Sequence, residues 1–318
     1  MARRPGSAGP AEMIWLLLVL GTLLIAPLIA ERLRRPPHQT LRASGSDHQQ
    51  PRNFADLPGG RTHYRWIGPD QGPVAVCIHG LTTPLQIYGP IAEGLAEAGY
   101  RVLCYDLPGR GYSDPVPGRQ DRAFFLAQLN GLLADQNIGR IELLVGYSMG
   151  GSIATVATAL APERVGALVL LAPAGLFHNA GWLAETLRRV PVLGDAVMLT
   201  LGGILMRRQL RQGAHTALTA LQIAQTRQRG FLPAVLSSQR HLLAENIGAD
   251  HRAVRAAGVP TLAVWGLDDT VIPISNIGRL AEVQRDARQE TVSGATHAMP
   301  YSHPEDVLDH ITLFLSEI

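Results

Sequence analysis

The chain has 318 residues, of which 46% are hydrophobic and 17% charged, and its formal net charge is +2. This length and apolar content suffice for one large core, and the small net charge argues against nucleic acid as a partner. All 28 basic residues are arginine, which excludes catalysis by lysine, whether as a Schiff base or in a Ser-Lys dyad. The two cysteines, Cys77 and Cys104, lie in apolar runs and read as small core residues; a four-thiolate metal site is excluded. We expect neither a metal nor a cofactor.

An uncharged apolar run occupies residues 13–30, and arginines flank it on both sides. Its roughly 18 residues, at about 1.5 Å rise each, would extend about 27 Å, close to the thickness of a bilayer's hydrocarbon core. We therefore predict a tail over 1–12, a single transmembrane anchor over 13–30 and a Pro-rich, polar linker over 31–53. More arginines follow the run than precede it, which favours the cytoplasmic side for the rest of the chain.

Two other interpretations of this run exist. A secretory signal cleaved after Ala30 has Arg3 and Arg4 as its charged start, but Leu28 stands where a small residue is wanted. A buried core helix is disfavoured, because the linker separates the run from the folded part.

From residue 54 onward, strand and helix patterns alternate. Residues 61–67 alternate polar and apolar side chains and indicate an early antiparallel strand. Continuous apolar runs predict buried strands at 74–79, 102–106, 141–145, 167–172 and 261–265, with helical spacing at 91–98, 124–133 and 152–160. The predicted fold class is α/β, a doubly wound and mostly parallel sheet whose ligand site lies at the carboxyl ends of the strands.

Residues 175–250 interrupt this rhythm with helical patterns alone. We predict a helical cap there, inserted into a core made of 54–174 and 251–318. Within the cap, residues 192–206 carry Asp195 as their only charge. Such a segment either packs on the sheet domain or forms an apolar, arginine-rimmed lid that meets lipid or an acyl chain.

The sequence Gly146-Tyr147-Ser148-Met149-Gly150 connects a predicted buried strand to a helix rich in small residues. A strand that enters a helix through G-x-S-x-G makes a sharp turn, which exposes the serine near the free N–H groups of the helix start. Ser148 is therefore the candidate nucleophile.

A serine hydroxyl needs a base and an acid that orients the base. Asp268 and Asp269 end a predicted strand, and His297 lies in a loop just past the last one. Serine, acid and histidine follow in the chain order that this fold uses, and all three lie at carboxyl ends of strands.

Five features in order resemble the α/β-hydrolase superfamily, in its esterase, lipase and monoacylglycerol-lipase-like branch. They are His79-Gly80, the segment Asp106 to Asp114, the elbow Gly146 to Gly150, Gly266-x-x-Asp269-x-x-x-Pro273 and Gly294-x-x-His297.

The resemblance implies a role for each matching residue. Asp269 is the acid rather than Asp268, because it lies three residues after the glycine. The oxyanion hole is formed by the backbone N–H groups of Leu81 and Met149. Tyr147 departs from many relatives and is expected to alter the shape of the pocket.

Other polar residues near these positions have expected local roles. His79 is expected to hold the loop that aims Leu81, and Asp106 to fix a loop through backbone hydrogen bonds. The spacing of Ser302 and Glu305 predicts a capping box that opens the last helix.

We therefore expect a membrane-anchored serine hydrolase that cleaves a small-molecule carboxylic ester with an apolar, lipid-like acyl part through an acyl-enzyme. One alternative keeps the triad but cleaves C–C, lactone, amide or N-terminal peptide bonds. Another is a non-catalytic binding protein on the same fold.

Overall fold

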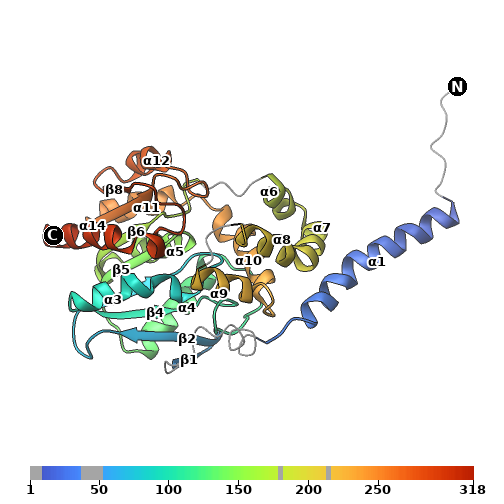
Figure 1. Cartoon of the computed structure of the whole chain (residues 1–318), viewed down its shortest axis with the longest axis horizontal. Helices are drawn as coiled ribbons and strands as arrows, with labels where there is room; N and C mark the ends of the chain where they lie inside the picture. The colour runs from blue at the N-terminus through green and yellow to red at the C-terminus, as the bar shows by residue number, and fades with distance from the viewer. Residues whose placement is uncertain (1–8, 37–52, 178–181, 213–215) are drawn as a thin grey trace.

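The computed structural model describes residues 9–36, 53–177, 182–212 and 216–318. An eight-stranded sheet crosses the molecule in the order β1-β2-β4-β3-β5-β6-β7-β8 (Figure 1). The first two strands, β1 (Asn53–Leu57) and β2 (Gly60–Ile67), are antiparallel to each other, and β2 is antiparallel to β4. The remaining strands are parallel: β3 (Val74–Ile78), β4 (Arg101–Tyr105), β5 (Ile141–Tyr147), β6 (Val165–Leu171), β7 (Thr261–Gly266) and β8 (Arg288–Val292). The predicted α/β class and mostly parallel sheet are confirmed.

Each central strand has both faces buried, which explains its continuous apolar sequence. In β3, Val76 and Ile78 belong to the core on one face, whereas Ala75 and Cys77 belong to the core on the other. Cys77 lies opposite Cys104 of β4, and both are fully buried free cysteines, as expected.

Helices cover both faces of the sheet. One face carries α3 (Gly89–Glu97), α13 (Met299–Ser302) and α14 (Pro304–Ser316), and the other carries α4 (Arg122–Asp135), α5 (Met149–Leu160), α11 (Gly248–Ala256) and α12 (Asn276–Val283). Single turns of 3-10 helix, η1 (Leu85–Tyr88) and η2 (Pro162–Arg164), join some of these elements.

The predicted capping box at the last helix is wrong. Ser302 ends α13, and α14 begins after His303 without a side-chain cap. The Ser302 hydroxyl is already engaged, because it bonds to the Ala298 carbonyl at 3.3 Å and to His303 Nδ1 at 2.9 Å.

Helices fill the long connection between β6 and β7: α6 (Trp182–Arg189), α7 (Pro191–Val197), the π-helical turn η3 (Met198–Gly202), α8 (Gly203–Leu210), α9 (Ala217–Gln225), α10 (Phe231–Arg240) and η4 (Leu242–Ala244). No strand occurs in the described part of this segment. We call α6 to η4 the cap helices. The next helix, α11, packs against α5 and so joins the sheet domain, which puts the end of the cap before residue 248 rather than at 250.

Helix α1 (Pro10–Arg32) projects from the side of the molecule that carries α7 and α8 (Figure 1). It is three residues longer at its start, and two at its end, than the predicted 13–30. Among the described residues it is the one helix long and apolar enough to cross a membrane, a test that a signal sequence also passes. Most of the predicted tail and linker lies outside the described residues.

Candidate active site

Ser148 stands at the tip of the turn between β5 and α5. Its backbone has φ 55° and ψ −119°, a conformation that non-glycine residues rarely adopt. A Cβ atom on Gly150 would lie 1.9 Å from the carbonyl oxygen of Ile78, and one on Gly146 would lie 2.5 Å from the carbonyl oxygen of Gly150. Both positions therefore require glycine, which explains the spacing around the serine.

The side chains of Ser148, His297 and Asp269 form a continuous chain of hydrogen bonds. His297 Nε2 lies 3.0 Å from Ser148 Oγ, and His297 Nδ1 lies 2.7 Å from Asp269 Oδ2. The other carboxylate oxygen of Asp269 accepts from the backbone N–H groups of Val271 and Ile272, at 2.8 and 2.9 Å. With Asp269 holding Nδ1–H, Nε2 is left to accept the serine proton.

The neighbouring Asp268 is exposed, whereas Asp269 is buried. Of the two candidate acids, only Asp269 reaches the histidine. Gly266 allows this approach, because a Cβ there would lie 2.4 Å from the Ala295 carbonyl oxygen in the loop that leads to His297.

The backbone N–H groups of Leu81 and Met149 flank the serine. Neither donates a hydrogen bond to any described residue. Met149 opens α5, where free N–H groups and the positive end of the helix dipole meet. Leu81 follows Gly80, whose added Cβ would lie 3.2 Å from the Cβ of Ser148.

His79 holds the loop that carries Leu81. Its Nδ1 donates to the Gly80 carbonyl, and its Nε2 accepts from the Leu107 N–H, both at 2.8 Å. Burial lowers the pKa of His79 to about 4, so the imidazole is neutral and structural.

Asp106 has an equally local role. It accepts from the backbone N–H groups of Leu85 and Tyr112 and lies 2.7 Å from His63 Nδ1. Burial opposes ionisation, but the contacts with His63 outweigh it and keep the pKa of Asp106 below its ordinary value. Asp106 therefore fixes the loop that follows β4, as expected.

Arg110 links this loop region to the cap helices, a role that the sequence reading missed. Its fully buried guanidinium donates to the Leu81 carbonyl at 3.1 Å and to the Ser238 hydroxyl of α10 at 2.8 Å. Arg110 stands inside the segment Asp106 to Asp114, which the sequence singles out. Its partners, however, are up to 128 positions away, so no local pattern indicates them.

A cavity of about 350 Å³ lies over Ser148 and His297. Its wall on the sheet side includes Leu81, Val271 and Ile272. The cap side is formed by Gln209, Leu218, Gln222, Gln239 and Leu243. The lining is mostly uncharged, which suits an apolar substrate with a few polar atoms.

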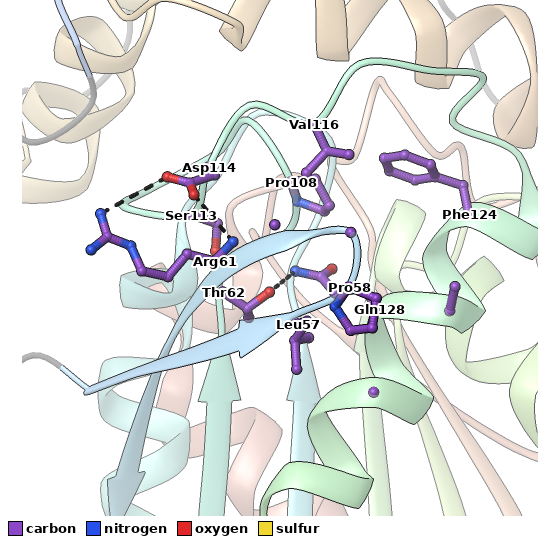
Figure 2. A pocket seen from close by; sticks show the side chains of 14 residues that line it. Leu57, Pro58, Arg61, Thr62, Pro108, Ser113, Asp114, Val116, Phe124 and Gln128 are labelled. Carbon is purple, nitrogen blue, oxygen red and sulfur yellow. Dashed lines mark hydrogen bonds and ion pairs between the residues drawn. The ribbon is translucent and has the colours of Figure 1, made fainter.

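A second cavity, of about 230 Å³, lies beside the β1–β2 turn, α4 and the segment 108–116 (Figure 2). It shares no lining residue with the first. Its polar groups mostly bind each other: Gln128 Nε2 donates to Thr62 Oγ1 at 2.9 Å, and the Arg61 N–H donates to Asp114 Oδ2 at 3.1 Å. No nucleophile and base pair faces it among the described residues, whereas Ser148 and His297 both line the first cavity.

Residues 73–304 match the family model described as alpha/beta hydrolase fold. The chain is 29% identical to a 2-hydroxy-6-oxononadienedioate/2-hydroxy-6-oxononatrienedioate hydrolase of Cupriavidus pinatubonensis, over 79% of this chain and 90% of the relative. It is 30% identical to a pimeloyl-[acyl-carrier protein] methyl ester esterase of Photobacterium profundum, over 79% of this chain and 97% of that one.

Solved structures share the fold. A membrane phospholipase A superposes with a TM-score of 0.70 at 20% identity and covers 96% of each chain. The curated relatives include both ester hydrolases and hydrolases of carbon-chain dioates.

Proposed function

Because the chain belongs to the α/β-hydrolase fold family, we propose that it is a serine hydrolase of carboxylic esters that works through Ser148, His297 and Asp269. The observation that supports this most directly is the hydrogen-bond chain from Ser148 Oγ through His297 to Asp269, at the floor of a mostly apolar cavity.

In the proposed reaction, Ser148 Oγ attacks the ester carbonyl while His297 Nε2 accepts its proton. His297 then donates that proton to the departing alkoxide, which leaves an acyl-enzyme. Water, activated by the same imidazole, releases the acid and restores the serine. Asp269 holds the imidazole in the tautomer that accepts at Nε2 and stabilises its charged form.

The negative charge that develops on the carbonyl oxygen needs donors already aimed at it. We assign this role to the N–H groups of Leu81 and Met149, which have no acceptor among the described residues. One such donor is typically worth a factor on the order of 10² to 10³ in rate.

The substrate that we propose carries an apolar acyl part and is met at a membrane. The cavity lining supports the first point, and α1 supports the second. Contacts at the end of the apolar run and just after it favour a retained anchor over a cleaved signal. Pro27 is buried against the rest of the chain, and the Glu31 carboxylate accepts from the Gly230 N–H. We place the chain as a single-pass membrane protein, with the cytoplasmic side favoured by the arginines that follow α1.

Hydrolysis of a carbon–carbon bond is the second candidate. The relative from Cupriavidus pinatubonensis, which is named as the hydrolase of a dioate, is 29% identical to this chain. A dioate has two carboxylates, and buried carboxylates are normally paired with cations. No arginine stands among the described residues that line the cavity over Ser148, which favours the ester.

Labelling by a fluorophosphonate probe and hydrolysis of short p-nitrophenyl esters test the proposal. We expect Ser148→Ala to abolish labelling and to lower kcat by a factor on the order of 10⁶. The matched control is Ser152→Ala, one turn along α5, whose buried hydroxyl has no hydrogen-bond partner among the described residues.

Labelling that persists in Ser148→Ala would refute the nucleophile. A wild-type chain that neither reacts with the probe nor hydrolyses any ester would favour the non-catalytic alternative. Hydrolysis of a ring-cleavage dioate in preference to esters would favour the second candidate.

A further inference from the structure

The cap helices present an apolar face that no described part of the chain covers. Five aliphatic side chains on α7, η3 and α8 are between 45% and 55% exposed: Val192, Leu193, Leu201, Ile204 and Leu205. Between Val192 and Met206 the only charged residue is Asp195, which pairs with Arg240 of α10. A continuous helical segment with this much exposed aliphatic surface indicates an apolar partner.

This face adjoins the end of α1. Helix α1 packs against α7 and η3, and its Pro27 is buried there. The Arg34 guanidinium donates to the Thr226 carbonyl at 2.7 Å and to the Leu199 carbonyl at 2.9 Å. At about 1.5 Å per residue, Pro27 lies about 8 Å from the end of the helix at Arg32. The apolar face is therefore level with the last turns of α1.

Arginines without acidic partners border the same face. Every described acid of the cap is engaged: Glu185 by Arg188 and Arg189, Asp195 by Arg240, and Glu245 with Asp250 of α11 by Arg122 of the core. Five arginines on or just after α8 and α9 have no ion pair to any described residue. Arg229 donates to the backbone carbonyls of Arg32 and Arg34, and the other four are Arg207, Arg208, Arg211 and Arg227.

Two of the positive charges at this site are close together. A Cβ atom on Gly203 would lie 3.2 Å from Arg207 Nη1 and 3.4 Å from Arg34 Nη1. Partial burial, together with the nearby Arg227, Arg34 and Arg211, lowers the pKa of Arg207. Arg34 is paired with Glu31 at 3.0 Å, so the uncompensated positive charge here is that of Arg207, and it favours binding of an anion.

We propose that the cap docks on an anionic phospholipid leaflet, with the aliphatic face of α7, η3 and α8 immersed and the four unpaired arginines at the level of the headgroups. This rests on the proposed membrane anchor, because α1 and the aliphatic face then enter the same leaflet. An immersion of about 5 to 10 Å is usual for helices that lie in the interface.

Docking of this kind also indicates the source of the substrate ester. Gln209 of α8 lines the cavity over Ser148, while Ile204 and Leu205 of the same helix belong to the docking face. A lipid ester in the leaflet therefore reaches the cavity along one helix. The substrate class is an ester resident in the membrane.

The test measures how deeply labelled positions of the full chain lie in the bilayer of nanodiscs made of phosphatidylcholine and phosphatidylglycerol. Both native cysteines are buried, so an introduced surface cysteine takes up an NBD label selectively. We would label Leu205→Cys on the docking face, Leu20→Cys on α1 and Leu160→Cys at the end of α5, all three exposed leucines. Nitroxide lipids quench NBD that lies in the acyl region.

We expect strong quenching at Leu205→Cys and Leu20→Cys, and at least fivefold less at Leu160→Cys. Quenching at Leu20→Cys with none at Leu205→Cys would overturn the docking proposal and leave the anchor intact. No quenching at Leu20→Cys would overturn the anchor itself. Neither result depends on catalysis, which the Ser148→Ala experiment tests separately.

A second arm tests the arginines. A basic residue near an anionic membrane contributes about 1 kcal/mol, roughly a factor of five. The double variant Arg208→Gln with Arg211→Gln removes two of these charges. In discs with phosphatidylglycerol, we expect it to raise the small fraction of undocked cap about 25-fold. This fraction is measured as the loss of quenching at Leu205→Cys. In discs of phosphatidylcholine alone, quenching at Leu205→Cys should be the same in the double variant and in the chain that keeps both arginines.

The control pair is Arg65→Gln with Arg252→Gln, two core arginines that likewise have no ion pair among the described residues. An equal effect of both pairs would show that net charge alone matters and would overturn the assignment of the headgroup site.

Discussion

The Tyr147 hydroxyl donates to the carbonyl oxygen of His297 at 2.7 Å, and the two rings lie 5.2 Å apart. Burial, with the negative charge of Asp269, raises the pKa of Tyr147, so the phenol remains a donor. Tyr147 therefore holds the loop of the proposed base, in addition to shaping the pocket.

We expect Tyr147→Phe to lower kcat on a p-nitrophenyl ester about fivefold, because one hydrogen bond of about 1 kcal/mol no longer positions His297. KM should change little. The matched control is Tyr105→Phe, since the buried Tyr105 hydroxyl has no described partner. Equal rates for Tyr147→Phe and the wild type would show that the hydroxyl does not position the base.

The buried His79 makes stability depend on pH. Burial lowers its pKa from about 6.5 to about 4, so between these values the unfolded chain binds a proton that the folded chain does not. Stability is therefore expected to fall as pH falls from about 6.5 to about 4, by roughly 1.4 kcal/mol per unit from this group. Asp106, whose pKa is lowered from 3.8, loses its contribution only below that window.

Chemical denaturation of the wild type and His79→Gln at pH 7.5 and pH 5 measures this contribution. We expect the variant to be less stable at pH 7.5 but to lose less stability on acidification. His251, whose pKa burial also lowers, supplies the part of the slope that remains in both proteins. An unchanged slope in the variant would mean that His79 titrates in the same range in both states.

Among the elements, the turn from β5 into α5 is tightly packed. A methyl group on Gly150 would overlap the carbonyl of Ile78 in β3. Ile78 pairs with Gly146 of β5, so its backbone cannot move away without disturbing the parallel pairing of these strands. We expect Gly150→Ala to cost more than about 3 kcal/mol, and Gly139→Ala, where nothing lies within 4 Å, to cost less than about 0.5 kcal/mol. Thermal unfolding of both variants checks this, and a similar Tm for the two would contradict it.

Sequence predicted the central elements because their signals are local. The apolar runs of β3 to β7 and the glycines around Ser148 follow directly from burial on both faces and from a sharp turn. Strand β1 was missed, because it is five residues long, has one buried side chain and exists through pairing with β2. The capping box failed since Ser302 bonds backwards into α13.

In the candidate site, too, the sequence indicates what depends on local patterns and misses what depends on distant partners. Spacing and chain order pointed to Ser148, Asp269 and His297, and these side chains lie within hydrogen-bond distance of one another. Contacts that support the site join distant residues and have no local pattern. Examples are Arg110 to Ser238 and Tyr147 to His297, which only the folded chain brings together.

At the scale of the whole molecule, direct contacts connect α1 to the cap helices and the cap helices to the cavity over Ser148. Helix α1 contacts α7 and η3, these lead into α8, and α8 lines the cavity over Ser148. If α1 crosses the bilayer, its orientation fixes where the cavity opens. The joint between α1 and the cap should therefore matter for esters in the membrane and not for esters in water.

Arg34 is the side chain to change at that joint. Its guanidinium bonds to the carbonyls of Thr226 and Leu199 and pairs with Glu31 at 3.0 Å. Arg34→Met keeps the apolar stem and removes these contacts, a loss of about 1.4 kcal/mol or more in holding the cap on α1. We expect hydrolysis of a long-chain ester in vesicles to fall about tenfold, while hydrolysis of a short soluble ester stays within about twofold of the wild type.

The matched control is Arg35→Met, which removes the same charge one residue along the chain. Among the described residues, only the backbone of Arg35 bonds to the cap, through the Arg227 carbonyl and the Arg229 N–H. Both variants lower the positive charge near the membrane equally, so a difference between them isolates the joint. Equal loss in the two would assign the effect to charge, and loss on the soluble ester would place Arg34 in the folding of the cap rather than in its orientation.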